Sequence, residues 1–133
     1  MNRVDFLLEL NRRAIPCTRE QLDLLWKFMH HVLETNEKFN LTAIKDEDAF
    51  VEKMIFDSAI FLNNQRYENM EVVDIGAGAG FPSMVIAILA PSLHVIALDS
   101  TSKKIDFINS FAKENDINVT GISVRAEEYA NEH

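Results

Sequence analysis

Three glycines alternate with alanines in residues 74–82, which read Asp-Ile-Gly-Ala-Gly-Ala-Gly-Phe-Pro. Glycine lets a backbone turn sharply, and it lets a ligand approach where a Cβ would obstruct it. A dinucleotide-binding fingerprint would need a glycine at position 81, which is phenylalanine, and a P-loop would need a lysine that this segment lacks. The spacing therefore favours a ligand without a pyrophosphate. We favour such a ligand over the alternative that the glycines only form a tight turn.

Two further polar segments follow the glycine segment. Asp99 ends the next apolar run, where an acidic side chain can accept hydrogen bonds from both hydroxyls of a ribose. Alone, such an aspartate is more typical of a helix cap, a role that residues 100–102 could share. Residues 125–128, Arg-Ala-Glu-Glu, follow a third run and could equally begin an acidic helix. Because the carboxyl ends of parallel strands meet at one edge of a sheet, we expect these segments to form one site.

Strands and helices that alternate in the second half must position these groups. Runs at 71–75, 93–99 and 119–124 are typical of strands, and the first reads as a buried one. Residues 82–91 and 102–114 predict the intervening helices. The helix at 82–91 is apolar nearly all round yet too short to span a bilayer, so we expect it inside the fold. The alternation predicts a parallel, doubly wound α/β sheet.

The first half predicts helices only. Thr18 and Gln21 form a capping-box pattern at the start of a helix expected over about 19–38. A shorter helix is expected over 4–14, ended before Pro16, and a third begins after a cap at Asp46. Residues 40–44 connect two of these helices. We therefore divide the chain into an N-terminal helical region, 1–66, and a ligand-binding region, 67–133.

Composition excludes several classes of protein. The 133 residues suit one domain, and a net charge of −8 argues against a simple nucleic-acid binder. One cysteine excludes a disulfide framework and a cysteine metal cluster. No N-terminal apolar stretch signals secretion or membrane insertion, so we expect a cytoplasmic protein. No Ser-His-Asp set or metal-binding helix motif is recognisable, and the adjacent His30 and His31 are expected to be surface or packing residues.

Taken together, the glycine segment, the strand-end aspartate and the Arg-Ala-Glu-Glu segment resemble the S-adenosylmethionine-dependent methyltransferases. More narrowly, four stretches resemble the glucose-inhibited division protein B family: Asn-Leu-Thr-Ala-Ile at 40–44, Phe-Asp-Ser at 56–58, Gly-Ala-Gly-Phe-Pro at 78–82 and Leu-Asp-Ser at 98–100. That family comprises bacterial methyltransferases acting on N7 of a guanine in 16S ribosomal RNA. The resemblance covers nearly the whole chain from about residue 19 onward.

The resemblance implies a Rossmann-like methyltransferase sheet, here incomplete with about three parallel strands, preceded by an N-terminal helical region. It implies S-adenosylmethionine as the cofactor, no metal, and 16S ribosomal RNA of the small ribosomal subunit as the partner. The implied cofactor-binding residues are Asp74, Gly76, Gly78, Phe81, Asp99, Ser100, Ala126 and Glu127. Of these, Gly76 and Phe81 would line the methionine side, Asp99 would hold the ribose, and Ala126 and Glu127 would border the adenine.

This sequence departs from the family's pattern in two ways. Met54 stands where the family usually has a histidine. The family's chain also continues with four further strands and a later arginine near the cofactor, so we expect a truncated chain that could be inactive alone. Its first strand would keep an unpaired apolar edge prone to self-association.

No catalytic side chain is assigned from the sequence. Asn40 and Asp57 are candidates by resemblance, with helix capping or a bond between helices as the favoured alternative for each. Two other functions stay open. One is a non-catalytic module that binds the cofactor or the ribosome, and the other is a methyltransferase acting on a small molecule or a protein.

Overall fold

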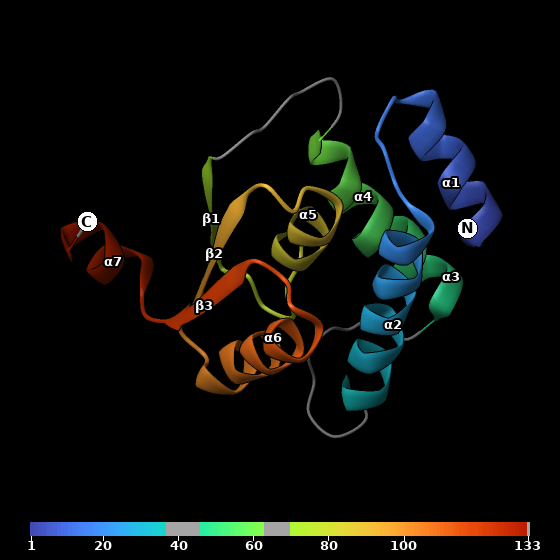
Figure 1. Ribbon diagram of the computed structural model, residues 1–133. Coiled ribbons are helices and arrows are strands. Elements are labelled where there is room, and N and C mark those ends of the chain that lie inside the picture. Colours follow the sequence, from blue (N-terminus) through green and yellow to red (C-terminus); the bar gives the residue numbers. More distant parts are fainter. Residues whose placement is uncertain (37–45, 63–69, 133) are drawn as a thin grey trace.

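A three-stranded parallel sheet organises the second half of the chain (Figure 1). The computed structural model describes residues 1–36, 46–62 and 70–132. The strands β1 (Glu71–Ile75), β2 (His94–Asp99) and β3 (Val119–Ser123) lie side by side in chain order. Helices α5 (Ser83–Leu89) and α6 (Ser102–Asn115) form the crossovers between them. This arrangement confirms the predicted α/β fold, including the positions of all three strands.

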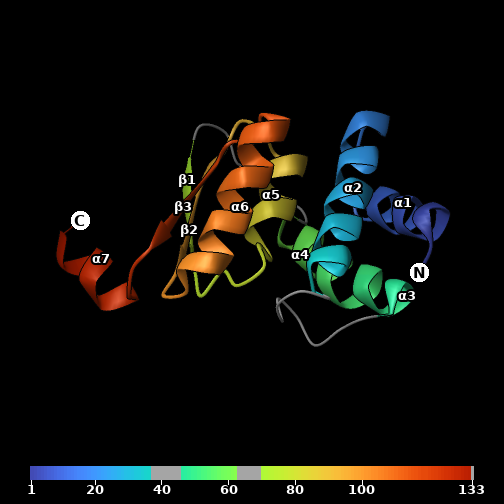
Figure 2. The same ribbon diagram turned by 90° about the horizontal axis from the view of Figure 1, so that it is seen from below.

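Both crossover helices cover the same face of the sheet. Because the strand order follows the chain order, two crossovers of the same hand place their helices on one face. Figure 2 shows α5 and α6 between the sheet and α2, whereas α7 (Ala126–Glu132) extends from β3 on the other side. All seven residues of α5 are buried, as expected for a helix enclosed by the fold. None of the described helices is both long and apolar enough to cross a membrane.

The first half is helical, as predicted. Its described elements are α1 (Arg3–Arg12), α2 (Arg19–Asn36), α3 (Glu47–Phe50), the π-helical η1 (Val51–Phe56), α4 (Asp57–Ala59) and the 3-10 turn η2 (Ile60–Leu62). The capping box is formed: the Gln21 amide donates to Thr18 Oγ1 at 3.1 Å, and the Thr18 amide donates to Gln21 Oε1 at 2.8 Å. Asp46 Oδ2 accepts from the Ala49 amide at 3.0 Å, which confirms the second cap. The expected connector 40–44 lies outside the described residues.

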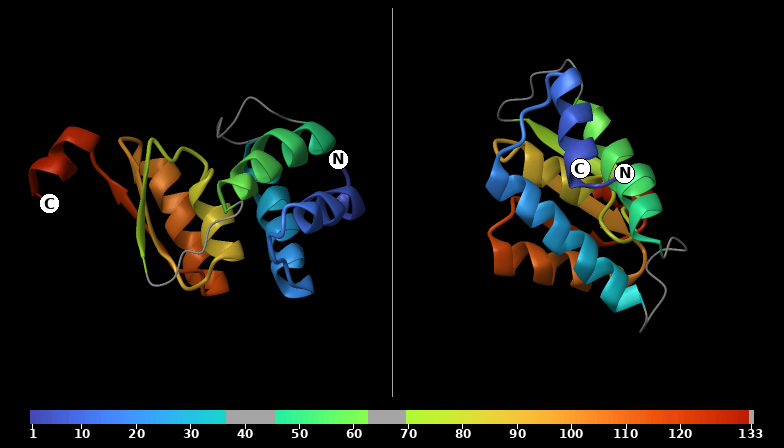
Figure 3. Two further views of the ribbon diagram at one scale, coloured as in Figure 1. Left: turned by 90° about the horizontal axis from the view of Figure 1, so that it is seen from above. Right: turned by 90° about the vertical axis from the view of Figure 1, so that its right-hand side faces the viewer.

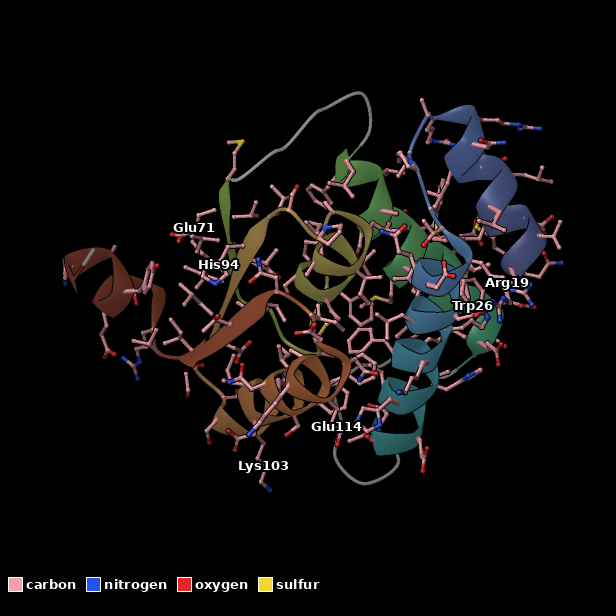
Figure 4. All side chains as sticks on the ribbon, in the orientation of Figure 1. Arg19, Trp26, Glu71, His94, Lys103 and Glu114 are labelled. Atoms are coloured by element: carbon pink, nitrogen blue, oxygen red, sulfur yellow. The ribbon has the colours of Figure 1, made fainter. Side chains whose placement is uncertain are left out.

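Helix α2 joins the helical region to the sheet region. Buried side chains from both regions form one hydrophobic cluster that extends from Phe6 to Val119. Side chains fill the space between α2 and the layer of α5 and α6 (Figure 4), and the left view of Figure 3 shows the same order of layers from the side opposite to that of Figure 2. Gln21 Nε2 donates to the Ile88 carbonyl at 3.2 Å, so α2 also bonds to the last turn of α5. The two regions therefore share a core.

Strand β1 is less buried than the sequence indicates. It was expected to be a buried strand, but Val73 is 41% and Ile75 68% exposed. The expectation is wrong because β1 lies at an edge of the sheet, and no described helix covers its outer face. The other edge is bonded at its centre: the Gly121 amide donates to Asn109 Oδ1 at 2.8 Å, and Asn109 Nδ2 donates to the Gly121 carbonyl at 3.1 Å. Among the described strands, β1 is thus the more open edge.

Candidate functional site

The glycine loop, residues 76–82, leaves β1 through a turn that requires glycine. Gly76, Gly78 and Gly80 have φ angles of 75°, 55° and 105°, a region that side-chain-bearing residues adopt only at a cost. The amides of Gly76 and Ala77 both donate to the Leu98 carbonyl, at 2.8 and 2.9 Å. These bonds hold the start of the loop against the carboxyl end of β2.

Asp99 lies at the end of β2 and faces the glycine loop. Its Oδ2 accepts from the Gly78 amide at 2.9 Å, and its Oδ1 accepts from the Thr101 amide at 2.8 Å. Partial burial tends to raise the pKa of Asp99, but the hydrogen bonds from Thr101 and Gly78 outweigh it and hold the pKa below its ordinary value. The side chain is therefore a carboxylate at neutral pH, and each oxygen keeps a lone pair for a ligand hydroxyl.

Asp74 forms a hydrogen bond at the far end of the glycine loop. Its Oδ2 accepts from the amide of Ser83, the first residue of α5, at 3.1 Å. Burial raises the pKa of Asp74 above its ordinary value, and the nearby negative charge of Asp99 acts in the same direction. The hydrogen bond joins the end of β1, two residues before the loop, to the first residue of α5 after it, so Asp74 links the two ends of the loop.

A cavity of about 610 Å³ opens at the carboxyl edge of the sheet. It is lined by Ile75, Gly76, Leu98, Asp99, Ser100, Val124, Arg125, Glu127 and Glu128, which follow or end the three strands. Ligands of open α/β sheets bind at this edge, and the volume suits a ligand of nucleoside size. A Cβ on Gly76 would meet no atom within 4 Å, so the glycine leaves the cavity free on that side.

The structure brings together only part of the predicted site. Gly76, Asp99, Ser100 and Glu127 line the cavity, and Gly78 is bonded to Asp99 behind it. Asp74 and Phe81 are not among the lining residues: Asp74 braces the loop, and the Phe81 ring packs against Phe28 and Phe50. Ala126 begins α7, and its side chain lies outside what the structure describes. The assignment of these residues to a cofactor stays a prediction.

Several lining residues were not assigned to the cofactor from the sequence, although Arg125 and Glu128 belong to the segment 125–128 that was expected at the site. Ile75, Leu98 and Val124 add apolar walls, and Arg125 and Glu128 add charged groups. The sequence could have indicated these residues, because each lies within two positions of a residue already assigned to the site. Of the two catalytic candidates, Asp57 begins α4 and Asn40 lies outside the described residues. Within the described part of the chain, no three His, Cys, Asp or Glu side chains are placed to hold a metal ion.

Comparison with known proteins gives a family and a fold. The model of the GidB family, described as rRNA small subunit methyltransferase G, matches residues 21–133. Ribosomal RNA small subunit methyltransferase G of Streptococcus thermophilus is 37% identical over 116 residues, which cover 86% of this chain and 49% of that protein. The proteins of the same name from Lysinibacillus sphaericus and Exiguobacterium sibiricum are 37% and 38% identical and each cover 97% of this chain, at 55% of their own lengths.

The chain thus spans about half the length of the curated relatives it matches. Among solved structures, coclaurine N-methyltransferase bound to N-methylheliamine and SAH matches with a TM-score of 0.51 at 15% identity. The match covers 92% of this chain and 44% of that one. At this identity the likeness shows the fold, which agrees with the predicted methyltransferase-like sheet.

Proposed function

Because the chain belongs to the GidB family, rRNA small subunit methyltransferase G, we propose that it binds S-adenosylmethionine in the cavity at the carboxyl edge of its sheet. We further propose that the bound cofactor serves methyl transfer to N7 of a guanine in 16S ribosomal RNA. The cytoplasm, where ribosomes work, is then the expected location. Residues 1–66 would form a helical region beside the cofactor-binding region, 67–133.

One observation carries the cofactor proposal: the open space beside Gly76 lies in the same cavity as the charged carboxylate of Asp99. The residues present fit the cofactor. Asp99 would accept hydrogen bonds from the ribose hydroxyls, and the backbone at Gly76 would border the methionine part. The apolar side chains of Ile75, Leu98 and Val124 suit the face of an adenine ring.

The proposed reaction requires the protein to position the reacting groups and does not require a side chain that transfers a proton. S-adenosylmethionine, when bound, supplies a methyl group on a positively charged sulfur. Guanine N7 has a free lone pair, so no side chain has to remove a proton before it attacks. The residues of this chain would contribute by fixing the ribose through Asp99 and by keeping the Gly76 side of the cavity open. No catalytic side chain is assigned.

Two measurements test this function. Isothermal titration of the chain with the product S-adenosylhomocysteine should give heat that saturates. If neither this product nor S-adenosylmethionine gives heat, the proposed cofactor binding is wrong. Labelled S-adenosylmethionine should then transfer its methyl group to 30S particles and not to free small molecules. Cofactor binding without transfer would favour a non-catalytic binding module. Labelling of small molecules alone would overturn the RNA assignment.

We also propose that a second copy of this chain pairs with the open edge of β1. An edge strand presents unpaired N–H and C=O groups to any extended strand, and on the opposite edge Asn109 already occupies both backbone groups of Gly121 in β3. In an antiparallel pair centred on Val73, the exposed Glu71 would lie opposite Ile75 of the second copy rather than opposite another carboxylate. Figure 4 shows Glu71 beside His94, whose Nδ1 lies 3.5 Å from Glu71 Oε2.

The Val73→Lys variant tests the self-association. A lysine on an edge strand opposes pairing, so light scattering after size-exclusion chromatography should show a dimer for the parent and a monomer for the variant. Val73→Thr, which keeps the β-branched shape, is the matched control and should stay dimeric. A parent chain that stays monomeric at the highest concentration tested would refute the pairing.

A further inference from the structure

The glycine loop is held at its two ends by different parts of the chain. Its start is bonded to Leu98 and Asp99 at the end of β2. At its far end, the ring of Phe81 lies against two rings of the helical region, Phe28 of α2 and Phe50 of α3. The ring centroids are 5.3 Å apart in both pairs, with interplanar angles of 40° and 79°. Phe28 and Phe50 are both fully buried.

Phe28 also lies against the backbone of the loop. A Cβ placed on Gly80 would be 3.1 Å from Phe28 Cζ, so the ring would have to move by a few tenths of an ångström to accept a side chain there. The Gly80 amide donates to the Ala77 carbonyl at 2.9 Å, and Ala77 is next to Gly76 at the cavity. A shift of the Phe28 ring would therefore move Gly80 and, through this short turn, the part of the loop that borders the cavity.

We propose that Phe28 and Phe50 are positioning residues for the glycine loop, although both belong to the N-terminal helical region. Neither side chain is among those that line the cavity, so each acts through Phe81 and Gly80. A displacement of α2 or α3 would then change the shape of the cavity proposed for the cofactor. The consequence for affinity rests on the proposed function, whereas the effect on the loop does not.

The small number of glycines offers a direct readout of the loop. The chain has four glycines, so a sample labelled with ¹⁵N-glycine gives four amide signals: three from the loop, at positions 76, 78 and 80, and one from Gly121 in β3. We expect Phe50→Leu and Phe28→Leu to shift the three loop signals. We also expect each to weaken S-adenosylhomocysteine binding by about tenfold, which corresponds to about 1.4 kcal/mol.

Phe6→Leu is the matched control. Phe6 is equally buried, and its described ring contacts are with Trp26 and Phe56 rather than with the loop. It should lower the melting temperature like the other two variants while leaving the loop signals and the affinity unchanged. Phe81→Leu alters the loop's own ring at a partly exposed position. It should also shift the loop signals, and it takes the place of Phe50→Leu if that variant proves too unstable to measure.

The outcomes separate the positioning role from the proposed function. Loop signals of Phe50→Leu and Phe81→Leu that superimpose on those of the parent would overturn the positioning role. Loop shifts in Phe6→Leu as large as those in Phe50→Leu would do the same, because they would reflect general destabilisation. If the parent binds no cofactor, the proposed function fails, and the glycine signals alone still decide whether Phe28 and Phe50 position the loop.

Discussion

The Gly76→Leu variant is expected to weaken S-adenosylhomocysteine binding by up to about 100-fold while the chain stays folded. A Cβ at position 76 meets no protein atom within 4 Å, and Gly76 lines the cavity, so we expect a leucine there to occupy space that the cofactor would fill. Overpacking a filled site costs about 1–3 kcal/mol, and each 1.4 kcal/mol is about tenfold in affinity. The hydrogen bond from the Gly76 amide to the Leu98 carbonyl keeps the backbone of this position at the cavity.

Gly76→Ala separates the filling of the cavity from backbone strain. The φ angle of +75° strains alanine and leucine alike, by about 1–2 kcal/mol, so both variants should lose similar stability to urea. Their affinities should differ, with alanine losing about tenfold at most, since it adds one carbon atom. Titration calorimetry measures both. A Gly76→Leu chain that binds as tightly as Gly76→Ala would show that the cofactor lies elsewhere.

The second half of the fold could be predicted because its signals are local. The β-branched runs, the apolar helix between Pro82 and Pro91 and the stripe of α6 each lie within a few residues, and they gave the strands and the crossovers nearly to the residue. The capping box at Thr18 is equally local. The π-helical turn Val51–Phe56 was not predicted, since its sequence has the periodicity of an ordinary helix.

The exposure of β1 could not be predicted from its own residues. Glu71–Ile75 is apolar enough to read as buried, and its place at the sheet edge, with an outer face that no described helix covers, leaves Val73 and Ile75 exposed. The candidate site likewise has residues that could be predicted from the sequence and one contact that could not. Asp99 and Gly76 belong to short motifs and lie in the cavity as a pair. The ring of Phe81 instead packs against Phe28 and Phe50, which are distant in sequence, and no local pattern indicates such a contact.

Asp74 illustrates why a motif residue need not touch the ligand. Its position at the end of β1 suggested a place in the cofactor site, yet its carboxylate bonds to the Ser83 amide across the glycine loop. Asp99 combines both roles, since it bonds to Gly78 and also lines the cavity. Each acid at a strand end thus helps to hold the loop, and the two differ in whether a ligand can reach them.

The Gly80→Ala variant is expected to destabilise the chain by about 2–5 kcal/mol, the sum of backbone strain and a clash inside the core. A Cβ at this position would lie 3.1 Å from Phe28 Cζ and 3.4 Å from Met84 Cβ. The φ angle of 105° adds strain that no neighbouring residue can relieve. Because domains are stable by only about 5–15 kcal/mol, the shift in urea midpoint should be large.

Gly76→Ala is again the control, because it has a positive φ but an open environment. The difference in urea stability between the two alanine variants then measures the clash with the core together with the greater backbone strain at position 80. If Phe28 is the main obstacle, Gly80→Ala combined with Phe28→Leu should cost less than the sum of the single changes, by about 0.5–3 kcal/mol. Strict additivity would mean that the helical region does not press on the loop. Less-than-additive loss would show energetic contact between α2 and the glycine loop, independently of any cofactor.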